Sequence, residues 1–127
     1  NNLINSNVVA NAEEILNLSK DPDIIGIDEV QFFDEQIVAT CNFLANSGVR
    51  VILAGLDMDF ERNPFGKMPE LLAIADHVTK VRAICVSCGN EANYSYRISE
   101  NKKTVHLGQQ ESYQPLCRNC YNIKCNS

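Results

Sequence analysis

The hydrophobic and polar positions of the first third of the chain predict a helix followed by a strand. Apolar residues at helical spacing, with Glu13 and Glu14 at the start where the helix dipole favours acids, predict a short helix over 12–18. The sequence Asp21-Pro22-Asp23 breaks this helix. The apolar run 24–27 then lacks polar alternation, which is typical of a strand buried on both faces in a parallel sheet covered by helices.

A second helix and a second strand follow. Asp34 is a candidate N-cap and Gly48 a candidate C′ residue of a helix whose apolar stripe includes Cys41, which we interpret as a small core residue. The run 49–55 predicts the second strand. Strand, helix and strand at this spacing form a right-handed βαβ unit, so we expect the two strands to be parallel.

The next segment predicts one more helix and one more strand. Pro69 suits the first turn of a helix over 70–77, and His77 is expected to end that helix as a cation favoured by the dipole. The run 78–86 is a candidate third strand that leads directly into the first pair of cysteines.

The composition changes near Cys85, where helical periodicity stops. Residues 94–99 and 104–107 alternate well enough to predict a hairpin around a polar turn. We therefore expect an α/β fold with two parts, a core over residues 1–84 and a small appended module over residues 85–127.

Composition and charge exclude several classes of function. The chain has 127 residues, of which 45% are hydrophobic, and this is enough for a real core. Its net charge of −5 argues against a general nucleic-acid binder or a membrane-surface binder, because both need a basic face. No apolar run approaches the roughly 20 residues that cross a bilayer, and no signal-peptide pattern opens the chain. We therefore expect a cytoplasmic protein.

The cysteine spacing gives the most specific signal in the sequence. Two C-x-x-C pairs are present, Cys85 with Cys88 and Cys117 with Cys120. Each pair turns two thiolates toward one point, and two such pairs close a tetrahedral sulfur site that suits Zn²⁺. Their separation exceeds the common spacing of about 15–20 residues, which implies an extended loop inside the module. Because protein fills all four positions, we expect the zinc to be structural.

Two adjacent acids follow the first strand, at the edge where open α/β sheets bind their ligands. An acid at this position holds Mg²⁺ in P-loop enzymes, and a neighbouring acid can accept a proton from an attacking hydroxyl. Gln31 could instead orient a water, as in an ATPase of the helicase type. The D-E-x-Q spelling at Asp28, Glu29 and Gln31 leaves these alternatives open.

Aromatic residues near the expected crevice favour a pocket for a planar ligand such as a base. Phe60 and Phe65 lie in a loop with proline and glycine and are the better pocket candidates, whereas Phe33 is assigned to packing. Further pocket candidates are Phe32, Leu56 and Tyr113.

Four segments together carry a resemblance to a known family. They are I-G-I-D-E-V-Q-F-F at 25–33, A-G-L-D-M-D-F-E-R-N-P-F-G at 54–66, C-V-S-C-G at 85–89 and E-S-Y-Q-P-L-C-R-N-C-Y at 111–121. In this order the segments resemble the zinc-containing thymidine kinases of cells, bacteria and poxviruses. The resemblance covers about residues 12–121. It implies a RecA-like P-loop core with a parallel sheet and a zinc-ribbon-like β module that carries a lasso loop.

The resemblance also implies roles for individual residues. Glu29 corresponds to the glutamate that takes the proton from the nucleoside 5′-hydroxyl, and Asp28 to the aspartate on the Mg²⁺-ATP side. Phe60 corresponds to a wall of the thymine pocket. Ser95 lies where the family has a small hydroxyl near the base, and Tyr113 where a tyrosine packs on the nucleoside. The lasso, which grips the base through backbone groups, corresponds to Thr104, Val105, His106, Leu107 and Gly108.

The same resemblance implies the reaction and the partners. The substrates would be ATP and thymidine, in salvage of deoxynucleosides for DNA synthesis. The assembly would be a homotetramer, and thymidine triphosphate would act as a feedback inhibitor.

One departure from the family pattern stands out, the lack of a G-x-x-x-x-G-K-[ST] phosphate loop in these 127 residues. We therefore interpret the sequence as the C-terminal portion of such a kinase, with an α/β core that is incomplete at its N-terminus, and expect little or no kinase activity from it alone. Two rivals remain: a helicase-like P-loop ATPase, and a non-enzymatic zinc-ribbon module that binds nucleic acid or protein.

Overall fold

The structure is a computed structural model that describes residues 3–18, 21–98 and 112–127. The chain divides into two compact units. The first unit comprises residues 1–57 and 64–77, and the second comprises residues 58–63 and 78–127. The predicted division at residues 84 and 85 stays a prediction. Within the described ranges, no helix has the length and apolar character that crossing a membrane requires.

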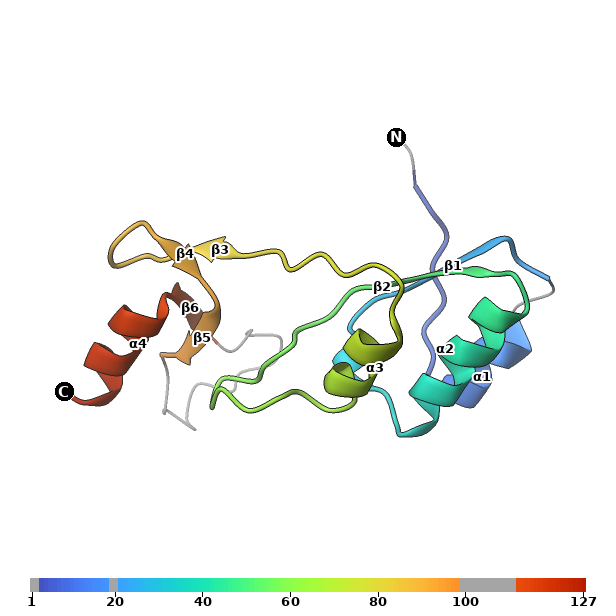
Figure 1. Ribbon diagram of the computed structural model, residues 1–127, viewed down its shortest axis with the longest axis horizontal. Helices are drawn as coiled ribbons and strands as arrows, with labels where there is room; N and C mark the ends of the chain where they lie inside the picture. The colour runs from blue at the N-terminus through green and yellow to red at the C-terminus, as the bar shows by residue number, and fades with distance from the viewer. Residues whose placement is uncertain (1–2, 19–20, 99–111) are drawn as a thin grey trace. The chain divides into compact units, whose positions relative to one another are not determined.

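The first unit contains short helices and a pair of parallel strands (Figure 1). Its elements are α1 (Ala12–Leu18), β1 (Ile24–Ile27), the 3₁₀ helix η1 (Val30–Phe32), α2 (Gln36–Asn46), β2 (Arg50–Leu53) and α3 (Met68–Ile74). Strands β1 and β2 run parallel, with Ile24 opposite Arg50 and Ile27 opposite Leu53. The expected strand–helix–strand order and parallel pairing are confirmed.

The core of the first unit lies on one face of this strand pair. Ile27 is buried, and Ile25, Val51 and Leu53 pack on the same cluster, together with Cys41 as expected. The opposite face is open: Ile24 is 59% exposed and Ile52 is 49% exposed. The expectation of a strand buried on both faces is therefore wrong for the described chain, because the packed residues lie on one face only.

Asn11 and Asp34 both accept hydrogen bonds at the start of α1, although Asp34 was predicted to cap α2. Asn11 caps α1, its side chain accepting a hydrogen bond from the N–H of Glu14. Asp34 does not cap α2, which begins after Glu35; its carboxylate accepts from the N–H of Ala12 at 3.0 Å, at the start of α1. A carboxylate there satisfies one free N–H and meets the positive end of the α1 dipole. The predicted stop at Gly48 is confirmed, with a φ of 90° at this residue.

The segment that leads to the cysteines is less regular than predicted. Helix α3 starts with Pro69 in its first turn, as expected, but ends at Ile74, so His77 lies beyond it. The predicted strand 78–86 is reduced to β3 (Ala83–Ile84). Val78 and Val81 are exposed, and without a packed face the apolar pattern does not form a longer strand.

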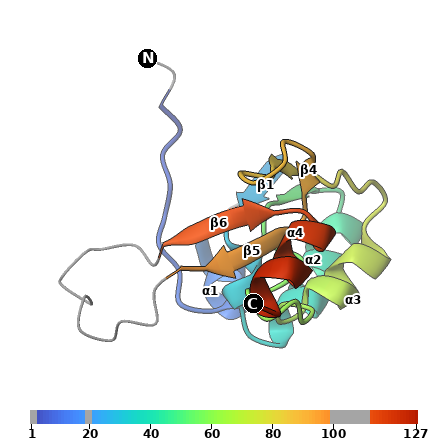
Figure 2. The ribbon, with the colours of Figure 1, turned by 90° about the vertical axis from the view of Figure 1, so that its left-hand side faces the viewer.

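The second unit consists of short antiparallel pairs and a helix (Figure 2). Strand β3 pairs with β4 (Glu91–Ala92), β5 (Tyr94–Arg97) pairs with β6 (Tyr113–Leu116), and α4 (Arg118–Cys125) packs on β5 and β6. The described partner of β5 is thus β6; the predicted partner 104–107 lies outside the described residues. A separate small core forms from Cys85, Ala92, Tyr94, Leu116 and Tyr121.

Candidate active site and metal centre

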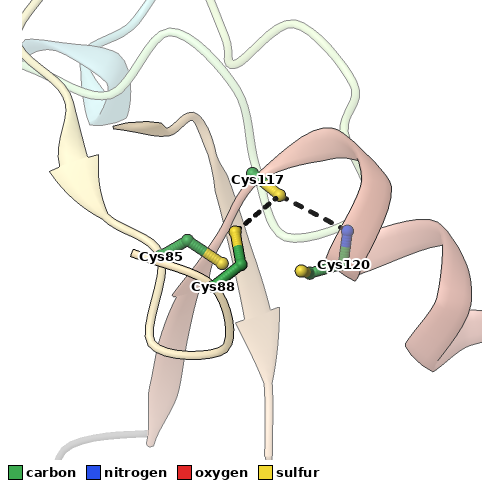
Figure 3. A group of neighbouring side chains, drawn as sticks. All are labelled: Cys85, Cys88, Cys117 and Cys120. Carbon is green, nitrogen blue, oxygen red and sulfur yellow. Dashed lines mark hydrogen bonds between the residues drawn. The ribbon is translucent and has the colours of Figure 1, made fainter. Parts of the chain in front are cut away.

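The two C-x-x-C pairs meet in the second unit, as their spacing predicted (Figure 3). Cys85 follows β3 in a tight turn, in which its carbonyl accepts from the N–H of Gly89. Cys117 is the N-cap residue of α4, and its sulfur accepts from the N–H of Cys120. Strand ends and a helix start therefore fix the backbone on both sides of the cluster.

The distances within this cluster fit a single metal ion. All four sulfur atoms lie within 4.8 Å of one another, and those of Cys88 and Cys117 are 3.6 Å apart. Four thiolates bound to one zinc ion lie about 3.8 Å from one another, because each Zn–S bond is about 2.3 Å long. All six cysteines are free thiols, so disulfides do not compete for these sulfurs. The cluster can therefore hold a metal ion.

The pKa values of the four clustered thiols differ from one another. Burial alone would raise the pKa of the Cys85 thiol, but hydrogen bonds from backbone N–H groups, that of Cys117 foremost, outweigh it and lower this pKa to about 6. A hydrogen bond with the Cys117 side chain raises the pKa of Cys120 to about 12. Four close thiols cannot all ionise without a cation between them, and a divalent ion would supply that charge.

The paired acids lie in the first unit, directly after the carboxyl end of β1. Asp28 and Glu29 are both exposed, and a carboxylate oxygen of Asp28 accepts from the N–H of Glu29 at 2.8 Å. Glu29 has φ 52° and ψ 40°, in the left-handed region that few non-glycine residues adopt. This turn leads from β1 into η1.

Gln31 connects the acid-bearing loop to the end of β2. Its side chain is 3% exposed. The amide nitrogen donates to Oε2 of Glu29, and the amide oxygen accepts from the N–H of Leu56 at 3.1 Å. Both ends of the amide are therefore occupied by protein groups, which counts against the water-orienting role that a helicase-type ATPase would give to Gln31.

The aromatic pocket candidates of the first unit lie beside this loop. The rings of Phe32 and Phe65 meet edge to face, with centroids 5.3 Å apart. Phe32 is 70% exposed, whereas Phe65 packs partly on the first core. Leu56 is half exposed. Phe33 packs on the first core, as assigned.

The loop that carries Phe60 belongs to the second unit. The Asp59 carboxylate organises this loop by accepting from the N–H groups of Glu61 and Asn63, at 2.9 and 3.0 Å. The carbonyl of Phe60 accepts from the hydroxyl of Tyr121 on α4 at 2.6 Å. The helix that contains Cys120 thus also holds the Phe60 loop.

Arg62 strengthens the attachment of this loop to α4. Its guanidinium lies 4.8 Å from the centre of the Tyr121 ring, and it donates to the side chain of Asn122 at 2.6 Å. A cation over an aromatic face is worth about 0.5–1 kcal/mol at an exposed site. No local pattern points to Arg62, whereas Tyr121 is an aromatic residue directly after the second cysteine pair, which is a recognisable signal.

Ser95 and Tyr113 lie on the same face of the β5–β6 pair. Ser95 is opposite Pro115, and Tyr113 is opposite Arg97, so all four residues share one face. The guanidinium of Arg97 lies 5.2 Å from the centre of the Phe60 ring. Three residues singled out by the resemblance therefore gather around Arg97, a residue to which neither the motifs nor the resemblance pointed. The five lasso residues lie outside the described residues.

Comparison with known proteins agrees with the motifs. A family profile described as thymidine kinase matches residues 2–121. The thymidine kinase of Porphyromonas gingivalis strain W83 is 56% identical over 126 residues, which cover 99% of this chain and 61% of that protein. The thymidine kinase of Bacteroides thetaiotaomicron is 53% identical over 93% of this chain and 59% of its own length. That of Rhodothermus sp. is 46% identical over 94% of this chain and 56% of its own length. The chain spans about three fifths of the length of these curated relatives.

Proposed function

This chain belongs to the thymidine kinase family, and we propose on that basis that the protein transfers the γ-phosphoryl group of ATP to the 5′-hydroxyl of thymidine. The observation that carries the proposal is the position of two acids directly after β1, beside the end of its parallel neighbour β2. Ligands of open α/β sheets bind at this edge.

Each acid has a separate role in the proposed reaction. Glu29 accepts the proton of the 5′-hydroxyl as that oxygen attacks the γ-phosphorus, and the bond from this phosphorus to the leaving ADP breaks. General-base help of this kind is worth about 10²–10⁴ in rate. The carboxylate of Asp28 would help to hold the Mg²⁺ that accompanies ATP. Most of the remaining rate enhancement comes from positioning and from charge stabilisation, as in phosphoryl transfer generally.

We propose that the nucleoside binds to the residues that the family resemblance singles out. The thymidine contacts Phe60, Ser95 and Tyr113. This assignment is supported by Arg97, which neighbours all three residues. The backbone of the lasso, at Thr104, Val105, His106, Leu107 and Gly108, completes the grip on the base. Within the first unit, Phe32, Leu56 and Phe65 stay candidates for an apolar pocket, and the exposure of Phe32 and Leu56 supports this.

The metal of the cysteine cluster is proposed to be structural Zn²⁺. An all-thiolate tetrahedral donor set suits this ion, and four protein ligands leave no position for a substrate. A zinc-ribbon-like module with a lasso, a RecA-like core and a homotetrameric assembly inhibited by thymidine triphosphate belong to the same proposal. A cytoplasmic location is supported by six free thiols, which suit a reducing compartment.

A coupled assay of ADP release tests this function. The full-length protein is mixed with Mg²⁺-ATP, with and without thymidine. Release of ADP that depends on thymidine, with thymidine monophosphate as the second product, supports the kinase. ADP release at the same rate without nucleoside would contradict it and would favour the ATPase.

The third interpretation, a zinc-ribbon module that binds nucleic acid, is weakened by how the cations are used. Most lysine and arginine residues lie in the second unit, so the acidic balance of the whole chain does not describe this unit. However, Arg62, Arg97, Arg118 and Lys124 all lie over aromatic rings of the same unit. A salt-sensitive gel shift with DNA or RNA would revive this interpretation.

A further inference from the structure

We propose that Gln31 is a positioning residue for the reaction: it fixes one oxygen of Glu29 so that the other oxygen faces the substrate hydroxyl. This inference rests on the proposed function, because it presumes that Glu29 accepts the proton. It gives Gln31 a different role from the orientation of a water molecule, which is the role that the D-E-x-Q motif has in a helicase-type ATPase.

The two hydrogen bonds of Gln31 determine which way its side-chain amide faces. An N–H group of Leu56 can only donate, and a carboxylate of Glu29 can only accept, so the amide has one orientation that satisfies both. Oε2 of Glu29 is the oxygen held by Gln31. The proton of the 5′-hydroxyl would therefore go to Oε1.

Backbone hydrogen bonds hold the segments on both sides of Gln31 in place. The N–H of Val30 donates to the carbonyl of Ala54, and the N–H of Ala54 donates to the carbonyl of Ile27. These bonds extend the pairing of β1 and β2 by backbone contacts beyond the strand ends. Gln31 thus links the Glu29 carboxylate to the hydrogen-bonded backbone that follows β1 and β2.

Two glycines leave the space that Gln31 occupies. A Cβ on Gly55 would lie 2.6 Å from the amide oxygen of Gln31. On Gly66, which has a φ of 50°, a Cβ would meet the backbone carbonyl oxygen of Gln31. Gly55 thus packs closely against the amide of Gln31, and Gly66 packs closely against the backbone of the same residue.

Glu29 itself needs such support. It is exposed, and a glutamate side chain has several rotatable bonds that solvent leaves free. A misplaced base loses much of its rate contribution, because proton transfer requires hydrogen-bond reach of the reacting hydroxyl. The buried amide removes this freedom at the carboxylate.

The sharpest variant is Gln31→Glu in the full-length protein. A carboxylate at this position keeps the shape of the side chain and still accepts from Leu56, but it cannot donate to Glu29 when ionised. Two adjacent carboxyl groups then compete for one proton. We expect the acid limb of the kcat profile to move to higher pH by at least one unit, with a thymidine KM within about twofold of wild type.

A second variant removes the hydrogen bonds without adding charge. Gln31→Met has a similar length, and we expect kcat to fall about tenfold or more, within the range that the base itself supplies. Thr40→Val on α2 is the matched control, since Thr40 is also a buried polar residue of the first unit. A thermal melt of both variants separates a loss of stability from a loss of rate: Thr40→Val is expected to lower Tm but not kcat.

Two outcomes would overturn the inference. One is an unchanged kcat in Gln31→Met together with an unshifted pH profile in Gln31→Glu. The other is a loss of kcat in Thr40→Val equal to that in Gln31→Met at the same loss of Tm. Glu29→Gln distinguishes this failure from failure of the proposed function: if that variant keeps near-normal turnover, the base assignment itself is wrong.

Discussion

At the scale of single residues, the position of the Glu29 carboxylate depends on how closely its loop packs against its neighbours. The left-handed backbone of Glu29, the buried amide of Gln31 and the space left by Gly55 form one connected arrangement. Each of these features belongs to the first unit and can be changed without touching the cysteine cluster of the second unit.

Gly55→Ala tests this packing from the side of the second strand. The new methyl group would overlap the amide oxygen of Gln31 and a methyl group of Val30. Overpacking of this kind costs about 1–3 kcal/mol. We expect a lower Tm and a lower kcat in the full-length protein. Gly26→Ala is the control, because a Cβ there meets nothing within 4 Å; equal kcat in both variants would contradict the packing argument.

The two cysteines outside the cluster should differ in reactivity. Cys41 is 4% exposed, and burial raises the pKa of its thiol. At pH 8, in metal-loaded protein, we expect the thiol reagent DTNB to label Cys125 rapidly, because it is exposed at the end of α4, and to label Cys41 only as the protein unfolds. Mass spectrometry of the labelled peptides checks this.

The raised pKa of Cys41 also has a consequence for stability. Because the folded thiol ionises at higher pH than the unfolded one, its contribution to stability is complete below the ordinary thiol pKa of about 8.5 and falls as pH rises beyond it. Urea melts of wild type and Cys41→Ala between pH 7 and pH 10 should show a steeper alkaline decline in wild type. Parallel pH curves would contradict this.

At the scale of elements, α4 joins the metal centre to the proposed nucleoside pocket. Tyr121→Phe keeps the ring but removes the hydroxyl that holds the carbonyl of Phe60. One such bond is worth about 0.5–1.5 kcal/mol, so we expect the thymidine KM to rise several-fold. The ATP KM and the metal content should not change. Tyr96→Phe in the same aromatic cluster is the control, and an equal rise in its thymidine KM would contradict a specific role of Tyr121.

The elements that sequence patterns predicted well are those with local signals. Helix 12–18, the two parallel strands and the stop at Gly48 follow from spacing and from single turn-forming residues. The prediction of a strand over 78–86 was wrong, because Val78 and Val81 are exposed and do not pack against another element. Asp34 was misassigned, because its carboxylate reaches a helix 22 residues earlier in the chain, a tertiary contact that no local pattern contains.

The candidate site shows the same limit. The spacing of the two cysteine pairs predicted the cluster that could hold a metal ion, because each C-x-x-C pair is a local motif. The acids were identifiable because they follow a strand directly. The partners of Gln31, Arg62 and Arg97 were not identifiable, because each of these side chains contacts residues brought close only by folding.

At the scale of the whole molecule, the two units have separate cores and should respond differently to metal removal. Structural zinc supplies on the order of 10 kcal/mol of folding free energy. Chelation, or Cys85→Ala, should unfold the second unit while the first unit keeps its protected amides in hydrogen exchange. Thymidine binding should be lost together with the metal, because the Phe60 loop belongs to the second unit. Full amide protection of the second unit in metal-free protein would contradict a structural role.

The central claim is that Glu29 accepts the proton in a thymidine-dependent phosphoryl transfer. The most direct measurement is the turnover of Glu29→Gln in the full-length protein, with thymidine affinity measured by calorimetry on the same sample. If Glu29 is the base, kcat falls by about 10²–10⁴ and thymidine affinity is retained. Near-normal turnover in Glu29→Gln would contradict it.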